Sequence, residues 1–508
     1  NIFAQGGYGA TFGATTGQIK FRTVIQEDFT GSFPDTSVDN GDFFRNDATI
    51  TGDVLNVNPG QNFAPHIDTG NNLPFNESDS SSTYFYLPRG KFNSNSGQDD
   101  GYEVSVFQIK DSDGNLKTGN TVVAGDEVTY RIKYTLPFAD IEQLKFTSFL
   151  PLPVFNESLS RLDITTVHSG PPVLEQIVYG PMDTLNTFYG SVNPIIPSTG
   201  PNLSVGRQNN SLLFNYGNFD DPGTVAPQTI DLLYTLEVGD QVTENNLLLT
   251  NLVYQQEGST NGGSRTFAKY ALLELGQPEL KITQGVVATS EAKAVFSEFF
   301  PVIGNSPNPP TLGFTAPRTP GVRFTGTINS ETLSTTDYFN LDSDITADLS
   351  DALGSNLEHN GDNNSITDLV TYAIILENTG TSPNGAFDVL IKDNLPTGLH
   401  IPMSGLNLQV AYGNGAFINS SDIEFLGGGP DGINGTPDDL FGNGIRLNDS
   451  TTGAIAAYNS TSGDNVVVIT YDLEVDDNLA NETIITNTAI LEEYSSSEGG
   501  AKFLPGSQ

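Results

Sequence analysis

The chain of 508 residues carries 21 Lys and Arg against 61 Asp and Glu, a formal net charge of −40, and it contains no Cys. This charge excludes the clustered basic side chains that nucleic-acid binding needs, and it opposes docking on anionic lipid. The absence of Cys excludes disulfides, thiolate metal sites and a cysteine nucleophile. No apolar run reaches the roughly 18 residues of a membrane-spanning helix, so we expect no membrane span.

Residues 1–101 contain no copy of the repeat that follows, and we expect a separate, β-rich N-terminal region there. Residues 1–18 carry no charged side chain, and a predicted strand follows them. Four side chains alternate onto one face of that strand: Ile19, Phe21, Thr23 and Ile25. The leader 1–26 is basic, through Lys20 and Arg22, in a strongly acidic protein. It suits insertion at an open sheet edge of an acidic neighbouring copy, and the alternative is the first strand of the chain's own N-terminal domain.

From residue 102 onward the sequence is dominated by strands. Period-2 segments rich in Val, Ile, Thr, Tyr and Phe, such as 127–134 and 466–473, alternate with Gly, Pro, Asn and Asp. Only 290–300 and 345–357 have a helical pattern. The sequence therefore predicts an all-β fold of tandem immunoglobulin-like antiparallel β-sandwiches, with a β-rich N-terminal region and an insertion of loops and helices.

An internal repeat divides this part of the chain. Three pairs of segments match in the same order and at nearly constant spacing: 128–130 with 370–372, 232–238 with 469–475, and 249–251 with 485–487. Ordered matches of this kind indicate a duplicated structural unit. We place one unit at 102–277 and a second at 278–508, with an insertion at about 290–365 in the second.

The second unit carries four recognisable motifs. They are Val-Thr-Tyr at 370–372, Asn-Thr-Gly at 378–380, Asp-x-Leu-Pro-x-Gly-Leu at 393–399 and Thr-Asn-Thr-Ala at 486–489. The Asn-Thr-Gly motif is expected to supply the positive φ angles of a turn. Over 366–495 the sequence resembles the conserved-repeat domain, a domain of unknown function, of large bacterial and archaeal cell-surface proteins. That resemblance implies an immunoglobulin-like sandwich in an extended surface protein, with no catalysis and no functional residue carried over.

Two acidic clusters offer oxygen ligands. The loop 429–439 combines Asp431, Asn434, Asp438 and Asp439 with several glycines, a donor set that suits Ca²⁺. The alternative for this loop is a solvated acidic turn. The second cluster includes Asp342 and Asp344, for which the charged N-terminal face of a short helix is the favoured interpretation over a metal site. The one cofactor that the sequence suggests is therefore Ca²⁺.

No enzyme signature such as a Walker A or Gly-x-Ser-x-Gly motif is present in the sequence. We therefore expect a non-enzymatic structural protein at the surface of, or outside, a prokaryotic cell: a homopolymer forming a filament, sheath or surface layer. An adhesin or adhesin stalk is the alternative, and a secreted polysaccharide-active module is a third interpretation. Sequons such as those at Asn76, Asn156 and Asn481 allow glycans.

Overall fold

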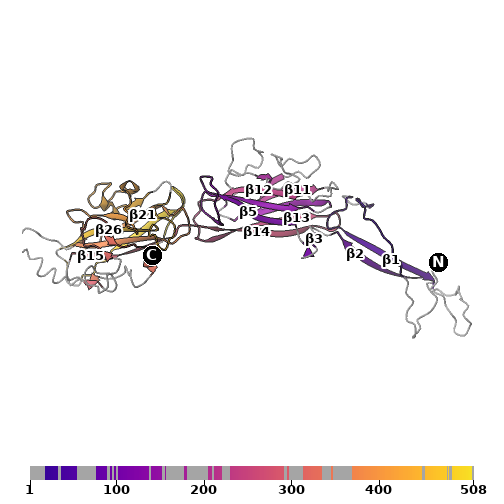
Figure 1. Cartoon of the computed structure of the whole chain (residues 1–508), viewed down its shortest axis with the longest axis horizontal. Helices are drawn as coiled ribbons and strands as arrows, with labels where there is room; N and C mark the ends of the chain where they lie inside the picture. Colours follow the sequence, from indigo (N-terminus) through magenta and orange to yellow (C-terminus); the bar gives the residue numbers. More distant parts are fainter. Residues whose placement is uncertain are drawn as a thin grey trace, which may run out of the picture.

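Most strands of the computed structural model belong to a long N-terminal hairpin and two β-sandwiches in a row (Figure 1). The structure describes residues 18–31, 36–53, 76–87, 92–93, 97–98, 101–136, 139–151, 155, 177–179, 204–208, 211–219, 229–290, 295–296, 313–334, 345–346, 369–448, 452–476, 479 and 483–505. Nearly all regular structure among these residues is strand. The prediction of an all-β fold with tandem immunoglobulin-like sandwiches is confirmed.

The N-terminal region contains a long two-stranded hairpin. Strands β1 (Phe43–Asp53) and β2 (Asn76–Tyr86) pair antiparallel along their whole lengths. Phe44 and Phe85 face each other in this register, and their rings stack at 4.9 Å. Phe29 stacks in turn on Phe44 at 5.6 Å. A two-stranded ribbon is marginal in water by itself, so these aromatic contacts and the docking of its base stabilise it.

The first sandwich closes around aromatic side chains from both of its sheets. Its strands are β5 (Tyr102–Lys110), β6 (Thr121–Val122), β7 (Glu127–Thr135), β8 (Ile141–Phe149), β9 (Ile177–Tyr179), β10 (Ser204–Gln208), β11 (Ser211–Phe219), β12 (Thr229–Glu237), β13 (Leu247–Gly258) and β14 (Arg265–Leu275). One sheet has the order β5-β7-β12-β9 and the other β10-β11-β8-β13-β14-β6. Tyr130, Phe146 and Tyr234 are buried between the sheets.

The base of the hairpin is fastened to the turn between β13 and β14. The buried carboxylate of Asp42 accepts the backbone N–H of Asn261 at 2.9 Å and that of Asp39 at 2.8 Å. Asp39 accepts both the N–H and the hydroxyl of Thr260, at 2.7 and 2.6 Å. Burial raises the pKa of Asp39, which the bonds from Thr260 oppose. The hairpin is therefore tied to one end of the first sandwich.

The second sandwich repeats the same plan. Its strands are β15 (Leu280–Thr289), β20 (Leu369–Asn378), β21 (Phe387–Asn394), β22 (Leu399–His400), β23 (Gln409–Tyr412), β24 (Ile423–Phe425), β25 (Ile445–Leu447), β26 (Val466–Val475), β27 (Thr488–Ser495) and β28 (Lys502–Phe503). One sheet has the order β15-β20-β26-β22, with β23 also paired to β26, and the other β24-β25-β21-β27-β28. Strands β5, β7, β12, β8 and β13 thus correspond to β15, β20, β26, β21 and β27.

Polar contacts join the two sandwiches at the other end of β13. The Thr381 hydroxyl lies 2.8 Å from the side-chain oxygen of Asn245 and 2.9 Å from that of Asn246. The Asn245 oxygen also accepts the backbone N–H of Gln277 at 3.0 Å. Because Asn246 directly precedes β13, whereas the hairpin docks just after it, the hairpin and the second sandwich lie at opposite ends of the first sandwich (Figure 1).

Part of the insertion covers the outer face of one sheet in the second sandwich. Strands β17 (Gly313–Phe314) and β18 (Phe324–Thr325) form a hairpin, and helix α1 (Ser330–Ser334) follows. A small second core results, formed by Val287, Phe314, Phe324, Ile328, Ala373, Ile375, Ala411, Val466 and Val468. This cover explains why β26 is buried along its whole length instead of alternating.

The helical predictions within the insertion are wrong where the structure describes them. Val295–Phe296 and Ile345–Thr346 are antiparallel strands paired with each other, and the rest of 290–300 and 345–357 lies outside the described residues, apart from Ser290. β-Branched and aromatic residues favour strands, and this preference prevails over the local helical spacing. The remaining short elements are β3 (Phe92–Asn93), β4 (Gly97–Gln98), β16 (Val295–Phe296), β19 (Ile345–Thr346), η2 (Ser420–Asp422) and η3 (Pro437–Phe441).

Candidate functional site

The predicted assembly segment lies on the surface. All side chains of residues 19–25 are exposed to solvent, among them Ile19, Phe21, Thr23, Val24 and Ile25. The exposed fraction reaches 79% for Ile19 and 90% for Val24. No strand pairs with residues 18–26 anywhere in the described part of the chain, so the segment is not seen as the first strand of the chain's own sheet. Large apolar side chains exposed together in this way are typical of a surface that binds a partner.

The segment leaves the molecule beside the base of the hairpin. Asp28 forms an isolated antiparallel bridge with Ser37, and the N–H of Val38 donates to the carbonyl of Glu27 at 2.9 Å. Phe29 packs on the hairpin through its ring contact with Phe44. The chain is therefore anchored from about residue 27 onward, whereas the predicted strand before it makes no such contact.

Hydrogen bonds from backbone N–H groups to Asp439 hold the acidic loop in shape. Asp439 is buried, and its carboxylate accepts the N–H groups of Gly427 at 2.9 Å, Gly429 at 3.2 Å and Gly435 at 2.7 Å. It also forms the capping box at the start of η3, with Thr436 as the N-cap residue. This carboxylate therefore acts as the acceptor that holds a glycine-rich loop in place.

The neighbouring predicted ligands also bond within the loop. Asp438 accepts the N–H of Asp431 at 3.0 Å, and Asp431 accepts the N–H of Ile433 at 2.6 Å. Desolvation acts to raise the pKa of Asp438, but the hydrogen bonds from Asp431 and Thr436 lower it below its usual value. The side-chain oxygen of Asn434 accepts the backbone N–H of Gly428, just before the loop, at 3.4 Å.

In the part of the chain that the structure describes, no three His, Asp or Glu side chains come together as a metal site. The structure brings Asp431, Asp438 and Asp439 into one loop, with their oxygens turned to backbone N–H groups. Asp342 and Asp344 lie outside the described residues. The Ca²⁺ sites therefore remain predictions.

A buried polar cluster lies at the centre of the first sandwich. The hydroxyl of Tyr234 lies 2.9 Å from that of Ser148 and accepts the side-chain N–H of Asn251 at 2.6 Å. Ser148 also donates to the Asn251 oxygen at 2.7 Å. Burial raises the pKa of Tyr234 to about 12, and the bonds from Ser148 and Asn251 oppose that rise. These three residues link β12 of one sheet to β8 and β13 of the other.

The second sandwich has the same cluster with an aspartate, Asp393, in the position of Ser148. The hydroxyl of Tyr471 donates to Asp393 and accepts the side-chain N–H of Asn487 at 2.7 Å. Gln284 from β15 donates to both Asp393 and Tyr471 at 3.0 Å. Burial raises the pKa of Asp393 and of Tyr471. The Asp of the Asp-x-Leu-Pro motif and the Asn of the Thr-Asn-Thr-Ala motif therefore meet in one buried network.

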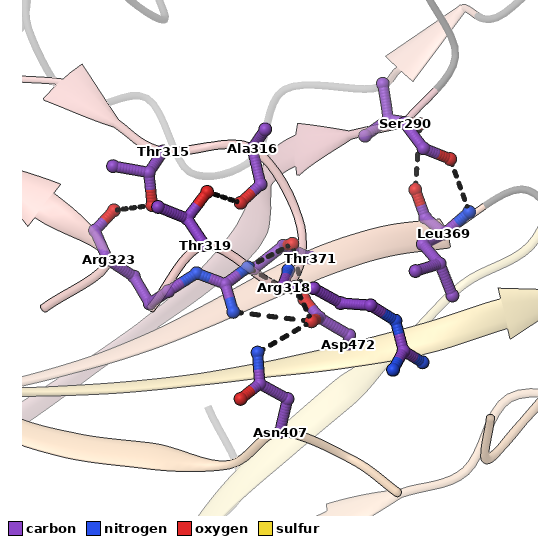
Figure 2. Close-up of polar contacts among 11 residues, drawn as sticks. Ser290, Thr315, Ala316, Arg318, Thr319, Arg323, Leu369, Thr371, Asn407 and Asp472 are labelled. Atoms are coloured by element: carbon purple, nitrogen blue, oxygen red, sulfur yellow. Dashed lines mark hydrogen bonds and ion pairs between the residues drawn. The ribbon is translucent and has the colours of Figure 1, made fainter. Parts of the chain in front are cut away.

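A buried ion pair fastens the insertion to the second sandwich (Figure 2). Arg323 binds Asp472 through two nitrogens, at 2.9 and 3.3 Å, and both side chains are buried. Thr371 donates to the same carboxylate at 2.6 Å and Asn407 at 3.1 Å. Burial acts to raise the pKa of Asp472, but Arg323 and Thr371 hold it below its usual value.

These clusters cross-link strands, and their chemistry is structural. His400 is the one histidine among the described residues, and its ring nitrogens face only carboxylates, Asp476 at 2.7 Å and Glu474 at 3.5 Å.

The recurrence of Tyr and Asn in the two repeat units was a signal for the Tyr234 and Tyr471 clusters. Arg323 had no such signal, because the insertion has no copy in the first unit.

No helix in the described ranges is long and apolar enough to cross a membrane. No protein-family model matches the chain, and no curated protein matches it.

Solved structures of bacterial surface proteins resemble this chain at low identity. The C-terminal domain of the antigen I/II polypeptide BspA of Streptococcus agalactiae is 11% identical, with a TM-score of 0.30, covering 79% of this chain and 97% of that one. The C-terminal domain of the antigen I/II-family protein AspA of Streptococcus pyogenes is also 11% identical, with a TM-score of 0.28 and coverages of 79% and 98%. The full-length major pilin SpaD of Corynebacterium diphtheriae is 13% identical, with a TM-score of 0.21 and coverages of 73% and 86%. Because all three TM-scores lie below 0.5, the proposals below rest on contacts within this chain.

Proposed function

We propose that this chain is a non-enzymatic structural subunit, outside or at the surface of a prokaryotic cell, that assembles with copies of itself into a filament, sheath or surface layer. The observation that carries the proposal is the unpaired segment with Ile19, Phe21 and Ile25 exposed in solvent. An extended segment gains both backbone hydrogen bonds and apolar burial when it joins the sheet of a neighbour.

The shape of the molecule supports a linear polymer. The segment leaves at the hairpin end of the first sandwich, whereas the second sandwich lies at the opposite end (Figure 1). A contact between unlike ends is heterologous, and it continues from copy to copy unless the rotation closes a ring. The fastened base of the hairpin, at Asp42 and Asn261, supports load transfer along such a chain.

An adhesin is the second candidate, and the β1–β2 hairpin supports it. The hairpin projects from the molecule with Ile50, Tyr84 and Tyr86 exposed. Exposed aromatic side chains on a β-ribbon suit a binding surface, because they bury large areas with little loss of side-chain entropy.

Electron microscopy of the purified full chain separates these candidates. A structural subunit should form filaments or sheets whose axial repeat corresponds to one molecule, without any added ligand. An adhesin should stay monomeric at the same concentration and bind cells or matrix through the hairpin. Monomers at all concentrations in sedimentation velocity, with intact circular dichroism, contradict the polymer proposal.

A further inference from the structure

One sheet of the first sandwich has an apolar surface on the side that points away from the core. On β13, Leu248 is 65% exposed and Tyr254 39%. On β14, Tyr270 is 60% exposed and Leu272 44%. These residues alternate with buried ones along each strand. We define the outer face as the alternate residues that point away from the core within four neighbouring strands: 145–149 of β8, 213–215 of β11, 248–256 of β13 and 266–274 of β14.

The apolar side chains of the outer face lie side by side across the strands. Leu252 has Phe149 of β8 in register on one side and Tyr270 of β14 on the other. The ring of Tyr254 meets the ring of Phe149 edge-on, with the centroids 5.3 Å apart. A continuous exposed apolar surface, in contrast to single exposed residues, is typical of an interaction site.

The equivalent surface of the second sandwich is more polar, so the fold itself does not require apolar side chains there. Strand β27 corresponds to β13 and β21 to β8, with the Asn that bonds the central tyrosine as the common reference. This register matches Leu252 with Thr488, Phe149 with Asn394 and Gln256 with Glu492. All three residues of the second sandwich are exposed and polar. The apolar character of the outer face therefore suits a contact that only the first sandwich makes.

The charges of the outer face favour a second copy of the chain as its partner. Two molecules of net charge −40 repel each other, except where the facing surfaces carry no net charge. The charged members of the outer face are one base, Lys145, and one acid, Glu274. Lys145 lies opposite Gln256 at the hairpin end of β13, and Glu274 lies opposite Leu248 at the other end. A copy turned about a two-fold axis across the strands brings the base of one molecule to the end that carries the acid of the other.

The size of the outer face suits a specific but small interface. Four strands about 4.8 Å apart, each rising about 3.4 Å per residue over 248–256 and its partners, span about 19 by 30 Å. Two copies then cover about 1,100 Å² in total, near the lower limit of about 1,000 Å² for a specific interface. One such contact is weak by itself. It becomes occupied when copies already joined in a filament present many of these faces in a row.

We propose that the outer face of the first sandwich is a lateral contact between copies of this chain, formed face to face about a two-fold axis. The inference rests on the proposed function and adds a second contact to the head-to-tail one. The strands of the outer face run along the long axis of the molecule, so the contact joins copies side by side (Figure 1). Because the two-fold axis reverses the strand direction, it pairs filaments that run in opposite directions.

Electron microscopy of a charge variant tests the contact in the full chain. Tyr270→Glu places two like charges in the contact, and Tyr270 is exposed, so the variant should fold normally. The matched control is Tyr458→Glu, which makes the same change at an exposed tyrosine of the second sandwich. We expect paired filaments for the natural chain and for the control, and single filaments of about half the width for Tyr270→Glu.

Single cysteines test the symmetry of the contact, because the sequence contains no Cys. A residue near a two-fold axis meets its own counterpart, so Thr250→Cys or Leu252→Cys should form a disulfide-linked dimer. The control is Thr488→Cys, since Thr488 takes the position of Leu252 in the second sandwich and is exposed. Under mild oxidation of the assembled protein, at least one outer-face variant should link about tenfold faster than the control, because pairing raises the effective concentration of the two thiols.

The outcomes separate this inference from the proposed function. Filaments of Tyr270→Glu that are as wide as those of the control overturn the inference and leave the polymer proposal standing. The same holds if neither outer-face cysteine links faster than Thr488→Cys. Folded monomers of Tyr270→Glu beside filaments of the control show that this face carries the polymer itself, and they overturn the assignment of a separate lateral contact. Linked dimers without any filaments overturn the polymer proposal alone, and the absence of both overturns both.

Discussion

Tyr234 and Tyr471 occupy the same position in the two sandwiches. Each lies directly opposite another tyrosine on the neighbouring strand, Tyr130 or Tyr372, and the paired rings stack at 5.5 and 5.6 Å. Each hydroxyl also bonds an Asn of the facing sheet. The two units therefore share a buried Tyr–Asn hydrogen bond that fixes how their two sheets face each other.

Removing the Tyr471 hydroxyl should destabilise the second sandwich. In Tyr471→Phe, Asp393 loses a donor and Asn487 loses an acceptor in a buried site, which costs about 1–3 kcal/mol. Urea unfolding followed by near-ultraviolet circular dichroism measures the loss. Tyr458→Phe is the control, because Tyr458 is exposed and its substitution should change the free energy of unfolding by less than about 0.5 kcal/mol. Equal urea midpoints for the two variants would show that the Tyr471 hydroxyl contributes nothing to stability.

Breaking the ion pair between Arg323 and Asp472 should release the insertion from the second sandwich. Arg323→Met leaves a buried carboxylate without its cation, at a cost of about 3–5 kcal/mol. We expect rapid proteolysis within 313–334, measured by mass spectrometry of the fragments. Arg318→Gln is the matched control, because the Arg318 side chain is exposed and points away from Asp472 in Figure 2. A double variant, Arg323→Met with Asp472→Leu, should recover most of the protection. If Arg323→Met is as resistant as the control, the pair does not hold the insertion.

The same pair should make part of the stability depend on acid. The folded pKa of Asp472 lies below its ordinary 3.8 because Arg323 and Thr371 oppose the effect of burial. Its contribution is therefore complete above the unfolded pKa and is lost as the pH falls through the folded pKa. Below about pH 3.8, the urea midpoint of the natural chain should fall relative to that of the double variant. A difference that stays constant from pH 7 to pH 2.5 at fixed ionic strength would contradict this.

Asp439 should stabilise the acidic loop without any metal. Asp439→Ala removes the acceptor of three glycine N–H groups and should lower the unfolding free energy by about 1–3 kcal/mol in EDTA. Asp431→Ala is the comparison variant: it removes an exposed acceptor of one backbone N–H of the same loop and should cost less than Asp439→Ala. The predicted Ca²⁺ site is tested in parallel: specific binding must raise the melting temperature of the natural chain at constant ionic strength, and an unchanged midpoint rejects it.

The strand pattern and the repeat could be predicted from the sequence because alternation is a local signal. The matched Tyr and Asn positions of the repeat did lie in equivalent places. The role of Gly380 was predicted wrongly. It does not adopt a positive φ, and Gly is required there because a Cβ would lie 2.2 Å from the carbonyl oxygen of Gln277. The burial of Arg323 against Asp472 could not be predicted, since it depends on contacts between segments far apart in the sequence.

Assembly through the N-terminal segment is tested most directly by sedimentation velocity of three surface variants. Phe21→Glu and Ile25→Glu place charge on the face that should enter the neighbouring sandwich, whereas Val24→Glu places the same charge on the opposite face. All three residues are exposed, so each variant should fold normally. We predict that Phe21→Glu and Ile25→Glu stay monomeric while Val24→Glu polymerises like the natural chain. If Phe21→Glu and Ile25→Glu polymerise as well, the segment does not join the copies.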